Sequence, residues 1–250
     1  MIRIENLNHI YRNRTKNALS DINLDIKKGE ILFIIGPNGS GKSTLFKCIN
    51  RLEEPTSGGI YVDGKEILEY TVKRLRSKIG MIFQNFNLIE RETVLNNVLN
   101  GCLRFNYTFD ILRGKFSEES YAIARDNIKL MGLEQYENDR VNTLSGGQRQ
   151  RVSIARTLSQ KPEIILADEP ISSLDPKLME EITSLLKNIC LDKSITLFSS
   201  LHSIDFVKRY GLRIVGINEG RIVFDGTPED LTENEISKIY NKKIIIDTKI

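Results

Sequence analysis

The segment GPNGSGKST, residues 36–44, constrains the fold more than any other part of this sequence. It matches the pattern G-x-x-x-x-G-K-[ST], follows the uniformly apolar run ILFII at 31–35, and leads into a helical pattern. Glycines leave room for phosphate oxygens against bare backbone, and N–H groups at the start of a helix attract anions. A glycine-rich turn without a ligand would need neither the lysine nor the serine. The segment therefore predicts a phosphate-binding loop between a buried strand and a helix.

The residues expected to bind nucleotide in this loop are one lysine and several residues with small or uncharged polar side chains. They are Gly36, Asn38, Gly39, Ser40, Gly41, Lys42, Ser43 and Thr44. Lys42 supplies a positive charge for the β- and γ-phosphates of a nucleotide, and the Ser43 hydroxyl is suited to bind Mg²⁺. We therefore expect ATP and Mg²⁺ as the ligands of this loop.

A second motif, IILADEP at 164–170, ends an apolar run in two acidic residues. The carboxyl ends of parallel strands are where α/β sheets bind ligands. We predict that Asp168 binds Mg²⁺ through water and that Glu169 polarises the attacking water as general base. Without the phosphate loop upstream, two solvated acids at the end of a strand would be the simpler interpretation.

The remaining pattern predicts an α/β fold with a mostly parallel sheet, an N-terminal antiparallel β subdomain and an inserted α-helical subdomain. Alternation of apolar and polar residues at 2–7 and 19–26 predicts half-buried antiparallel strands. Further strands are expected at 31–35, 59–62, 79–83, 163–167, 195–199, 212–217 and 221–225, and helices at about 42–50 and 177–189. Helical spacing of apolar residues at about 92–160 predicts the inserted subdomain, so 1–91 and 161–250 form the catalytic core of a single domain, 1–250.

Composition excludes several classes of protein. A net charge of +3, from 36 Lys and Arg against 33 Asp and Glu, is too small to predict nucleic-acid binding. No apolar stretch approaches the roughly 20 residues of a membrane-spanning helix, and the opening MIRIENL does not read as a signal peptide. Any membrane role is therefore expected to come through a partner. The three cysteines predict reduced packing residues, and two histidines exclude a histidine metal cluster.

The segment LSGGQ at 144–148 predicts a second anion-binding turn at the start of a helix. By itself it would be only a helix cap. One nucleotide does not need two phosphate cradles, so the pair makes sense if each cradle faces a nucleotide held by another chain.

With these motifs the sequence resembles the ATP-binding cassette family over nearly its whole length. The resemblance implies a P-loop NTPase (RecA-like) core and head-to-tail pairing, in which LSGGQ of one chain closes over the ATP of the other. It implies that Ser145, Gly146, Gly147 and Gln148 contact nucleotide. A P-loop kinase would have no reason to carry this signature.

The resemblance also assigns roles to four isolated residues. Gln84 is implied to be a ligand of Mg²⁺ and water, and His202, which lies 34 residues after Asp168 (202 − 168), to contact the γ-phosphate. Tyr11 is implied to stack on adenine and Asp175 to lie at the dimer seam, although Ser173 stands where the family usually has a small residue such as alanine. Structural roles remain the alternatives for Gln84, His202 and Tyr11, and His9 has no implied role.

Within the family the sequence is most similar to the ATPase subunits of phosphonate importers, on the segments 83–103, 105–124 and 200–226. Subunits of methionine, polar amino acid and phosphate importers share much of the same sequence pattern. The implied partners are a second copy of the chain, integral-membrane permease subunits and, indirectly, an extracytoplasmic solute-binding protein. The implied location is the cytoplasmic face of the membrane. A soluble cassette protein acting on ribosomes or DNA is the other candidate, but such proteins usually carry two cassettes or long coiled coils.

An apolar segment after Gln84 is the expected docking surface for the permease. Phe86 and Leu88 directly follow this residue, and a groove there would accept a short helix. The other apolar side chains of the region are Phe105, Tyr107, Phe109 and Phe116. Their alternative role is to form the core.

Overall fold

The computed structural model describes residues 1–12, 17–106, 115–171, 175–201 and 203–241. The chain forms two compact units, one of Met1–Val72 with Thr196–Ile250 and the other of Lys73–Ile195. The predicted helical subdomain, 92–160, falls within the second unit, which also contains two strands and a long helix. Its boundaries stay a prediction.

An antiparallel sheet forms one side of the first unit. Its strands are β1 (Ile2–His9), β2 (Leu19–Ile26), β4 (Ser57–Val62) and β5 (Lys65–Glu66), in the order β2-β1-β4-β5. The apolar residues of β1 and β2 are buried and most of the polar residues between them are not. The alternation read from the sequence therefore identified both strands.

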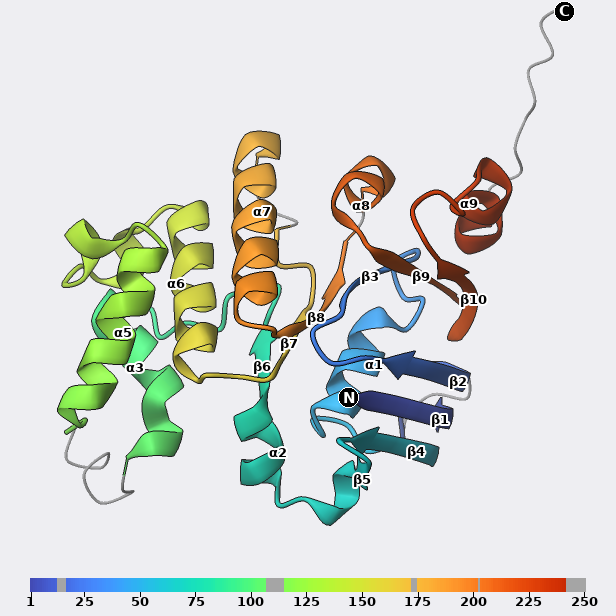
Figure 1. Ribbon diagram of the computed structural model, residues 1–250, viewed down its shortest axis with the longest axis horizontal. Helices are drawn as coiled ribbons and strands as arrows, with labels where there is room; N and C mark the ends of the chain where they lie inside the picture. The colour runs from blue at the N-terminus through green and yellow to red at the C-terminus, as the bar shows by residue number, and fades with distance from the viewer. Residues whose placement is uncertain (13–16, 107–114, 172–174, 202, 242–250) are drawn as a thin grey trace, which may run out of the picture. The chain divides into compact units, whose positions relative to one another are not determined.

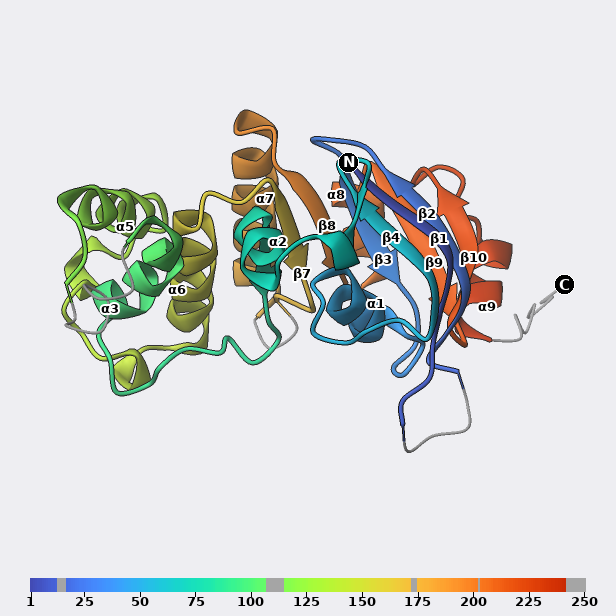
Figure 2. The same ribbon diagram turned by 90° about the horizontal axis from the view of Figure 1, so that it is seen from below.

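A second sheet in this unit is mostly parallel. β3 (Ile31–Ile35) pairs in parallel with β8 (Thr196–Ser200) and β9 (Arg213–Asn218), and β10 (Arg221–Gly226) is antiparallel to β9. Every residue of β3 and β8 is buried, as expected for strands covered on both faces. The helix α1 (Lys42–Ile49) and the antiparallel sheet lie on one side of these strands (Figures 1 and 2). The helices α8 (Ile204–Tyr210) and α9 (Glu233–Tyr240) lie on the other.

The second unit combines a parallel strand pair with most of the helices. β6 (Ile79–Ile82) pairs in parallel with β7 (Ile164–Ala167). Its α-helices are α2 (Val72–Lys78), α3 (Val94–Leu99), α5 (Glu118–Leu130), α6 (Gly146–Ser159) and α7 (Pro176–Asp192). Short 3-10 helices are η1 (Ile67–Glu69) in the first unit and η2 (Asn100–Phe105), η3 (Glu134–Tyr136) and η4 (Val141–Thr143) in the second. Helices α3, α5 and α6 pack against one another (Figure 1).

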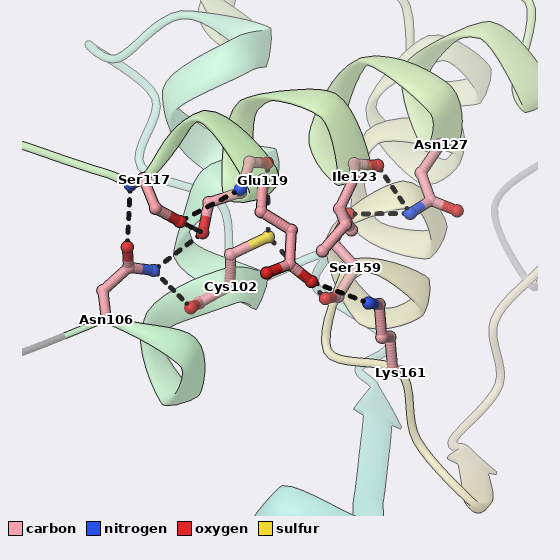
Figure 3. Close-up of polar contacts among 9 residues, drawn as sticks. Cys102, Asn106, Ser117, Glu119, Ile123, Asn127, Ser159 and Lys161 are labelled. Carbon is pink, nitrogen blue, oxygen red and sulfur yellow. Dashed lines mark hydrogen bonds and ion pairs between the residues drawn. The ribbon is translucent and has the colours of Figure 1, made fainter.

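A polar network joins η2, the start of α5 and the end of α6 within this helical group (Figure 3). The Asn106 amide nitrogen donates to Cys102 O and Ser120 Oγ, both at 2.8 Å, and its oxygen accepts the Ser117 N–H at 2.9 Å. The Cys102 thiol lies 3.7 Å from Ser120 O and Ser159 O. Burial raises the pKa of this thiol to about 11. It therefore stays protonated and serves packing, as predicted for the cysteines.

The α/β class with its parallel and antiparallel sheets is confirmed. The sequence analysis did not propose α2, α8 or α9, which are seven or eight residues long and, unlike the equally short α1, do not follow a glycine-rich phosphate loop. Among the described residues, no helix combines the length and the apolarity needed to cross a bilayer.

Candidate functional site

The phosphate loop is set by two close backbone approaches in the first unit. A Cβ at Gly36 would lie 2.1 Å from Ile217 O of β9, and a Cβ at Gly41 would lie 2.6 Å from Ala18 O. Gly41 also has φ +113°, a conformation that side chains rarely allow. The two glycines therefore let the turn between β3 and α1 lie against both sheets.

The centre of the loop is open and presents N–H groups. Gly39 has φ +77°, and a Cβ there would meet nothing within 4 Å. The Leu45 N–H donates to Gly41 O at 2.9 Å, whereas the N–H groups of Ser43 and Thr44 find no backbone acceptor in the described part of the chain. Unpaired N–H groups at the first turn of a helix attract anions. The loop therefore fits a phosphate group.

Lys42 is the first residue of α1, and only 4% of it is exposed. Its Nζ donates to Gly36 O at 2.8 Å and to Pro37 O at 3.1 Å. The ammonium is thus directed back over the loop, because the loop carbonyls hold it there. A buried cation in this place favours a polyanionic ligand.

The structure brings Tyr11 to the end of the phosphate loop. Its hydroxyl lies 3.1 Å from Thr44 Oγ1, and its ring meets the His9 ring edge-on, with centroids 4.7 Å apart. The sequence offered no sign of the contact with Thr44, which lies 33 residues away. Stacking of Tyr11 on adenine stays a prediction.

In the second unit, Gln84 and Glu169 form a hydrogen bond with each other, while their predicted roles stay predictions. Gln84 Nε2 donates to Glu169 Oε2 at 2.9 Å. Glu169 has φ +48°, an unfavourable conformation for a residue with a side chain, and such strain is concentrated at functional sites. Asp168 precedes it at the end of β7, with its N–H donating to Ile82 O at 2.9 Å and only 8% exposure. A Glu carboxylate oriented by an amide is a suitable base for a bound water.

The segment LSGGQ, residues 144–148, leads into α6. Ser145 Oγ accepts the Gln148 N–H at 3.3 Å, and Gln148 Oε1 accepts the Ser145 N–H at 2.8 Å, which completes a capping box. A Cβ at Gly146 would meet nothing within 4 Å, whereas one at Gly147 would lie 2.2 Å from Leu178 Cδ2 of α7. Gly146 therefore leaves the helix end open, and Gly147 permits close packing.

Asp175 has a local role that the resemblance did not imply. It is the N-cap of α7, where its Oδ1 accepts the Leu178 N–H at 3.1 Å. A side-chain oxygen in this position satisfies one of the free N–H groups of the first turn. The predicted place of Asp175 at a dimer seam remains untested.

The structure adds a clamp that sequence reasoning missed. Arg156, on α6, donates to the carbonyl oxygens of Phe86 (2.8 Å) and Asn87. Ser153 Oγ donates to Phe86 O at 3.3 Å. Phe86 and Asn87 have φ +57° and +50°, so the chain after Gln84 turns sharply where the arginine holds it. The feature of the sequence that could have indicated this contact is the pair Ser153 and Arg156, which lie three residues apart among apolar residues of α6.

This clamp is desolvated and is reinforced from α3. Burial lowers the pKa of Arg156. Asn97, fully buried on α3, donates to Ile89 O at 3.0 Å and accepts the Ile89 N–H at 2.8 Å. Two helices of the second unit thus fix the segment that follows Gln84.

The structure describes only some of the other predicted residues. His202 lies outside the described residues, as do Ser173, Tyr107 and Phe109. Phe86, Leu88, Phe105 and Phe116 are all half-buried, and the neighbouring Ile89 is 53% exposed. None of these apolar side chains is therefore fully withdrawn into the core.

The described residues contain no group of three His, Cys, Asp or Glu side chains that could bind a metal by themselves. This fits Mg²⁺, which is usually bound by one or two carboxylates together with phosphate oxygens of the substrate. Ser43 of the first unit and Asp168 of the second stay predicted ligands of Mg²⁺.

Comparison with known proteins gives consistent matches. The model of the family described as ABC transporter matches residues 19–172. The phosphonates import ATP-binding protein PhnC of Bdellovibrio bacteriovorus is 46% identical over 246 residues, covering 97% of this chain and 94% of that protein. The PhnC protein of Staphylococcus aureus is 42% identical over 252 residues, covering 100% and 98%.

Two solved structures illustrate the structural likeness. A dimeric ATP-binding cassette in a post-hydrolysis state, bound to ADP and phosphate, has a TM-score of 0.80 and 35% identity, covering 91% of this chain and 99% of that one. A nucleotide-free cassette from an ABC transporter has a TM-score of 0.81 and 28% identity, covering 100% and 98%.

Replacement of the clamp arginine should destabilise the second unit. Arg156→Ala leaves the Phe86 and Asn87 carbonyls without this partner, so we expect the free energy of unfolding to fall by about 1–3 kcal/mol, measured by urea denaturation. Arg125→Ala is the matched control, because Arg125 makes an exposed ion pair with Glu137 and should lose less than about 1 kcal/mol. Equal losses in the two variants would contradict a special role for the clamp.

Proposed function

This chain belongs to the ABC transporter family, and from that membership we propose that it is the ATP-hydrolysing subunit of a phosphonate importer. The observation that carries the ATPase role is the phosphate loop, with open backbone at Gly39, free N–H groups at Ser43 and Thr44, and the buried ammonium of Lys42. These groups present positive charge where a triphosphate would lie.

The proposed chemistry is hydrolysis of the terminal phosphate by water. Lys42 and the loop N–H groups stabilise negative charge on the transferred phosphoryl group. Glu169 accepts a proton from the attacking water, and Gln84 orients the carboxylate through their 2.9 Å hydrogen bond. Ser43, Asp168 and Gln84 would hold Mg²⁺, which would neutralise phosphate charge. His202 contacts the γ-phosphate in this proposal.

The segment LSGGQ, residues 144–148, is proposed to contact a nucleotide bound by another copy of the chain. Ser145 and the open backbone at Gly146 form a helix N-terminus whose free N–H groups suit a γ-phosphate. A solved cassette to which this chain is similar is dimeric and bound to ADP and phosphate, which supports a dimer that holds nucleotide. ATP would thus join two copies, with Asp175 at the seam.

Two substitutions separate binding from hydrolysis. Glu169→Gln removes the base but keeps the phosphate loop, so we expect Mg-ATP binding near the parental level, hydrolysis slowed at least about a hundredfold, and a dimer at saturating ATP. Lys42→Ala is the matched control and should lose ATP binding. Calorimetry, phosphate release and light scattering measure the three properties. A Glu169→Gln chain that hydrolyses ATP at the parental rate, or stays monomeric, would refute this mechanism.

The solute is proposed from the relatives alone. The proteins of Bdellovibrio bacteriovorus and Staphylococcus aureus that match this chain over nearly its whole length are phosphonate import subunits. A cassette of this kind acts at the cytoplasmic face of the membrane, beside permease subunits that receive solute from an extracytoplasmic binding protein. We expect ATP hydrolysis by the reconstituted transporter to be stimulated by binding protein loaded with an alkylphosphonate. Equal stimulation by methionine or inorganic phosphate would assign a different solute.

Coupling to the permease is proposed to pass through the segment after Gln84 and the helical subdomain at 92–160. Arg156 and Asn97 hold this segment, so a change at Gln84 would be transmitted to α6 and α3. Leu88 is half-buried and Ile89 is 53% exposed, which leaves an apolar surface beside the clamp for a short permease helix.

Charge on this apolar surface should prevent assembly. We expect Leu88→Asp and Ile89→Asp to bind ATP normally as isolated chains and to fail to co-purify with the permease from membranes. Leu212→Asp is the matched control, because Leu212 is also 53% exposed but lies in the first unit. Intact assembly of both variants would place the docking surface elsewhere.

A further inference from the structure

His9 is a buried polar residue to which the proposed function gives no role. It is the last residue of β1 and is only 4% exposed. Its carbonyl accepts the Ala18 N–H at 2.8 Å, and it pairs with Leu19 of β2. The backbone of His9 is therefore fixed by the antiparallel sheet.

The imidazole is fixed as well. Nδ1 lies 3.0 Å from Glu54 O, and because a carbonyl oxygen only accepts, Nδ1 must carry the hydrogen. This bond sets both the tautomer and the tilt of the ring. Nε2 is buried without a hydrogen-bond partner among the described residues.

An unpaired buried nitrogen is unfavourable, by about 1–3 kcal/mol, so packing alone would favour an apolar side chain here. Histidine instead combines an N–H donor for Glu54 O with an aromatic ring. What the ring contacts is Tyr11, edge-on, with centroids 4.7 Å apart and planes at 90°. The fixed imidazole therefore restricts the position of the Tyr11 ring.

Tyr11 is held at its other end by Thr44 of the phosphate loop, at 3.1 Å from the hydroxyl. An unbroken series of contacts thus runs from Glu54 O through His9 and Tyr11 to Thr44. Tyr11 is half-buried, so part of its ring stays accessible to a ligand.

We propose that His9 is a positioning residue for Tyr11, and that it sets the part of the ATP affinity that depends on the base. This inference rests on the proposed ATPase function and on the predicted stacking of adenine on Tyr11. Phosphate binding is expected to be independent of His9, because the Nζ of Lys42 is held by Gly36 O and Pro37 O.

The test compares ATP with inorganic triphosphate, which lacks a base, on the full-length chain by calorimetry. His9→Asn keeps an N–H donor and loses the ring, so we expect ATP to bind about 2–10-fold more weakly, the range expected for losing an aromatic edge contact. Triphosphate should bind as to the parent. His9→Phe keeps the ring and should lie closer to the parent than His9→Asn. A merely structural role would weaken both ligands together.

Tyr11→Ala and the double variant His9→Asn/Tyr11→Ala complete the cycle. Tyr11→Ala should lose about 5–150-fold in ATP affinity, the range expected for base stacking. The double variant should bind ATP no more weakly than Tyr11→Ala, because His9 acts only through the tyrosine.

Four results would overturn the inference. Additive losses in the double variant, or equal losses for ATP and triphosphate in His9→Asn, would show that His9 does not act through Tyr11. An unchanged ATP affinity in His9→Asn beside a loss in Tyr11→Ala would refute the role of His9 alone. An unchanged affinity in Tyr11→Ala would refute the adenine role of Tyr11 and this inference together, while the ATPase role of the phosphate loop would stand.

Discussion

The turn between β3 and α1 is the constraint on which the first unit depends. Side chains at Gly36 and Gly41 would collide with backbone oxygens from β9 and from the residue before β2. Around these glycines, the Gly220 N–H donates to Ser40 O and the Ser20 N–H to Gly220 O, both at 2.8 Å. The loop thus contacts both sheets through its backbone, and the N–H groups of Ser43 and Thr44, which find no backbone acceptor among the described residues, stay available for phosphate.

In the second unit the comparable constraint is the segment after Gln84. Three successive features hold it: the bond from Gln84 to Glu169, the arginine clamp on two carbonyls, and the Asn97 amide on both backbone groups of Ile89. Buried polar groups are stabilising only when their hydrogen bonds are complete. A segment held in this way has few alternative conformations, which suits its proposed role in coupling to the permease.

Several residues of the expected site also serve local structure. Ser145 and Gln148 cap α6, and Asp175 caps α7, so each satisfies N–H groups that a helix start leaves unpaired. The start of α6 is capped by Ser145 and Gln148, and no atom crowds the backbone at Gly146. An anion can therefore bind there without rearrangement of the helix. Local stability and proposed ligand binding therefore use the same physical feature.

The glycine-rich turn, the buried strands before it and before Asp168, and the helix start at Ser145 could be read from the sequence, because they depend on neighbouring residues and on short periods. Only the tertiary structure decided which distant side chains meet. Gln84 meets Glu169 across 85 residues, Arg156 meets Phe86 across 70, and His9 meets Glu54 across 45. Such pairs depend on the path of the chain between them, and one sequence carries no signal for that path. The short helices α2, α8 and α9 were likewise not predicted, since seven or eight residues give little periodicity and, unlike α1, these helices do not follow the phosphate loop.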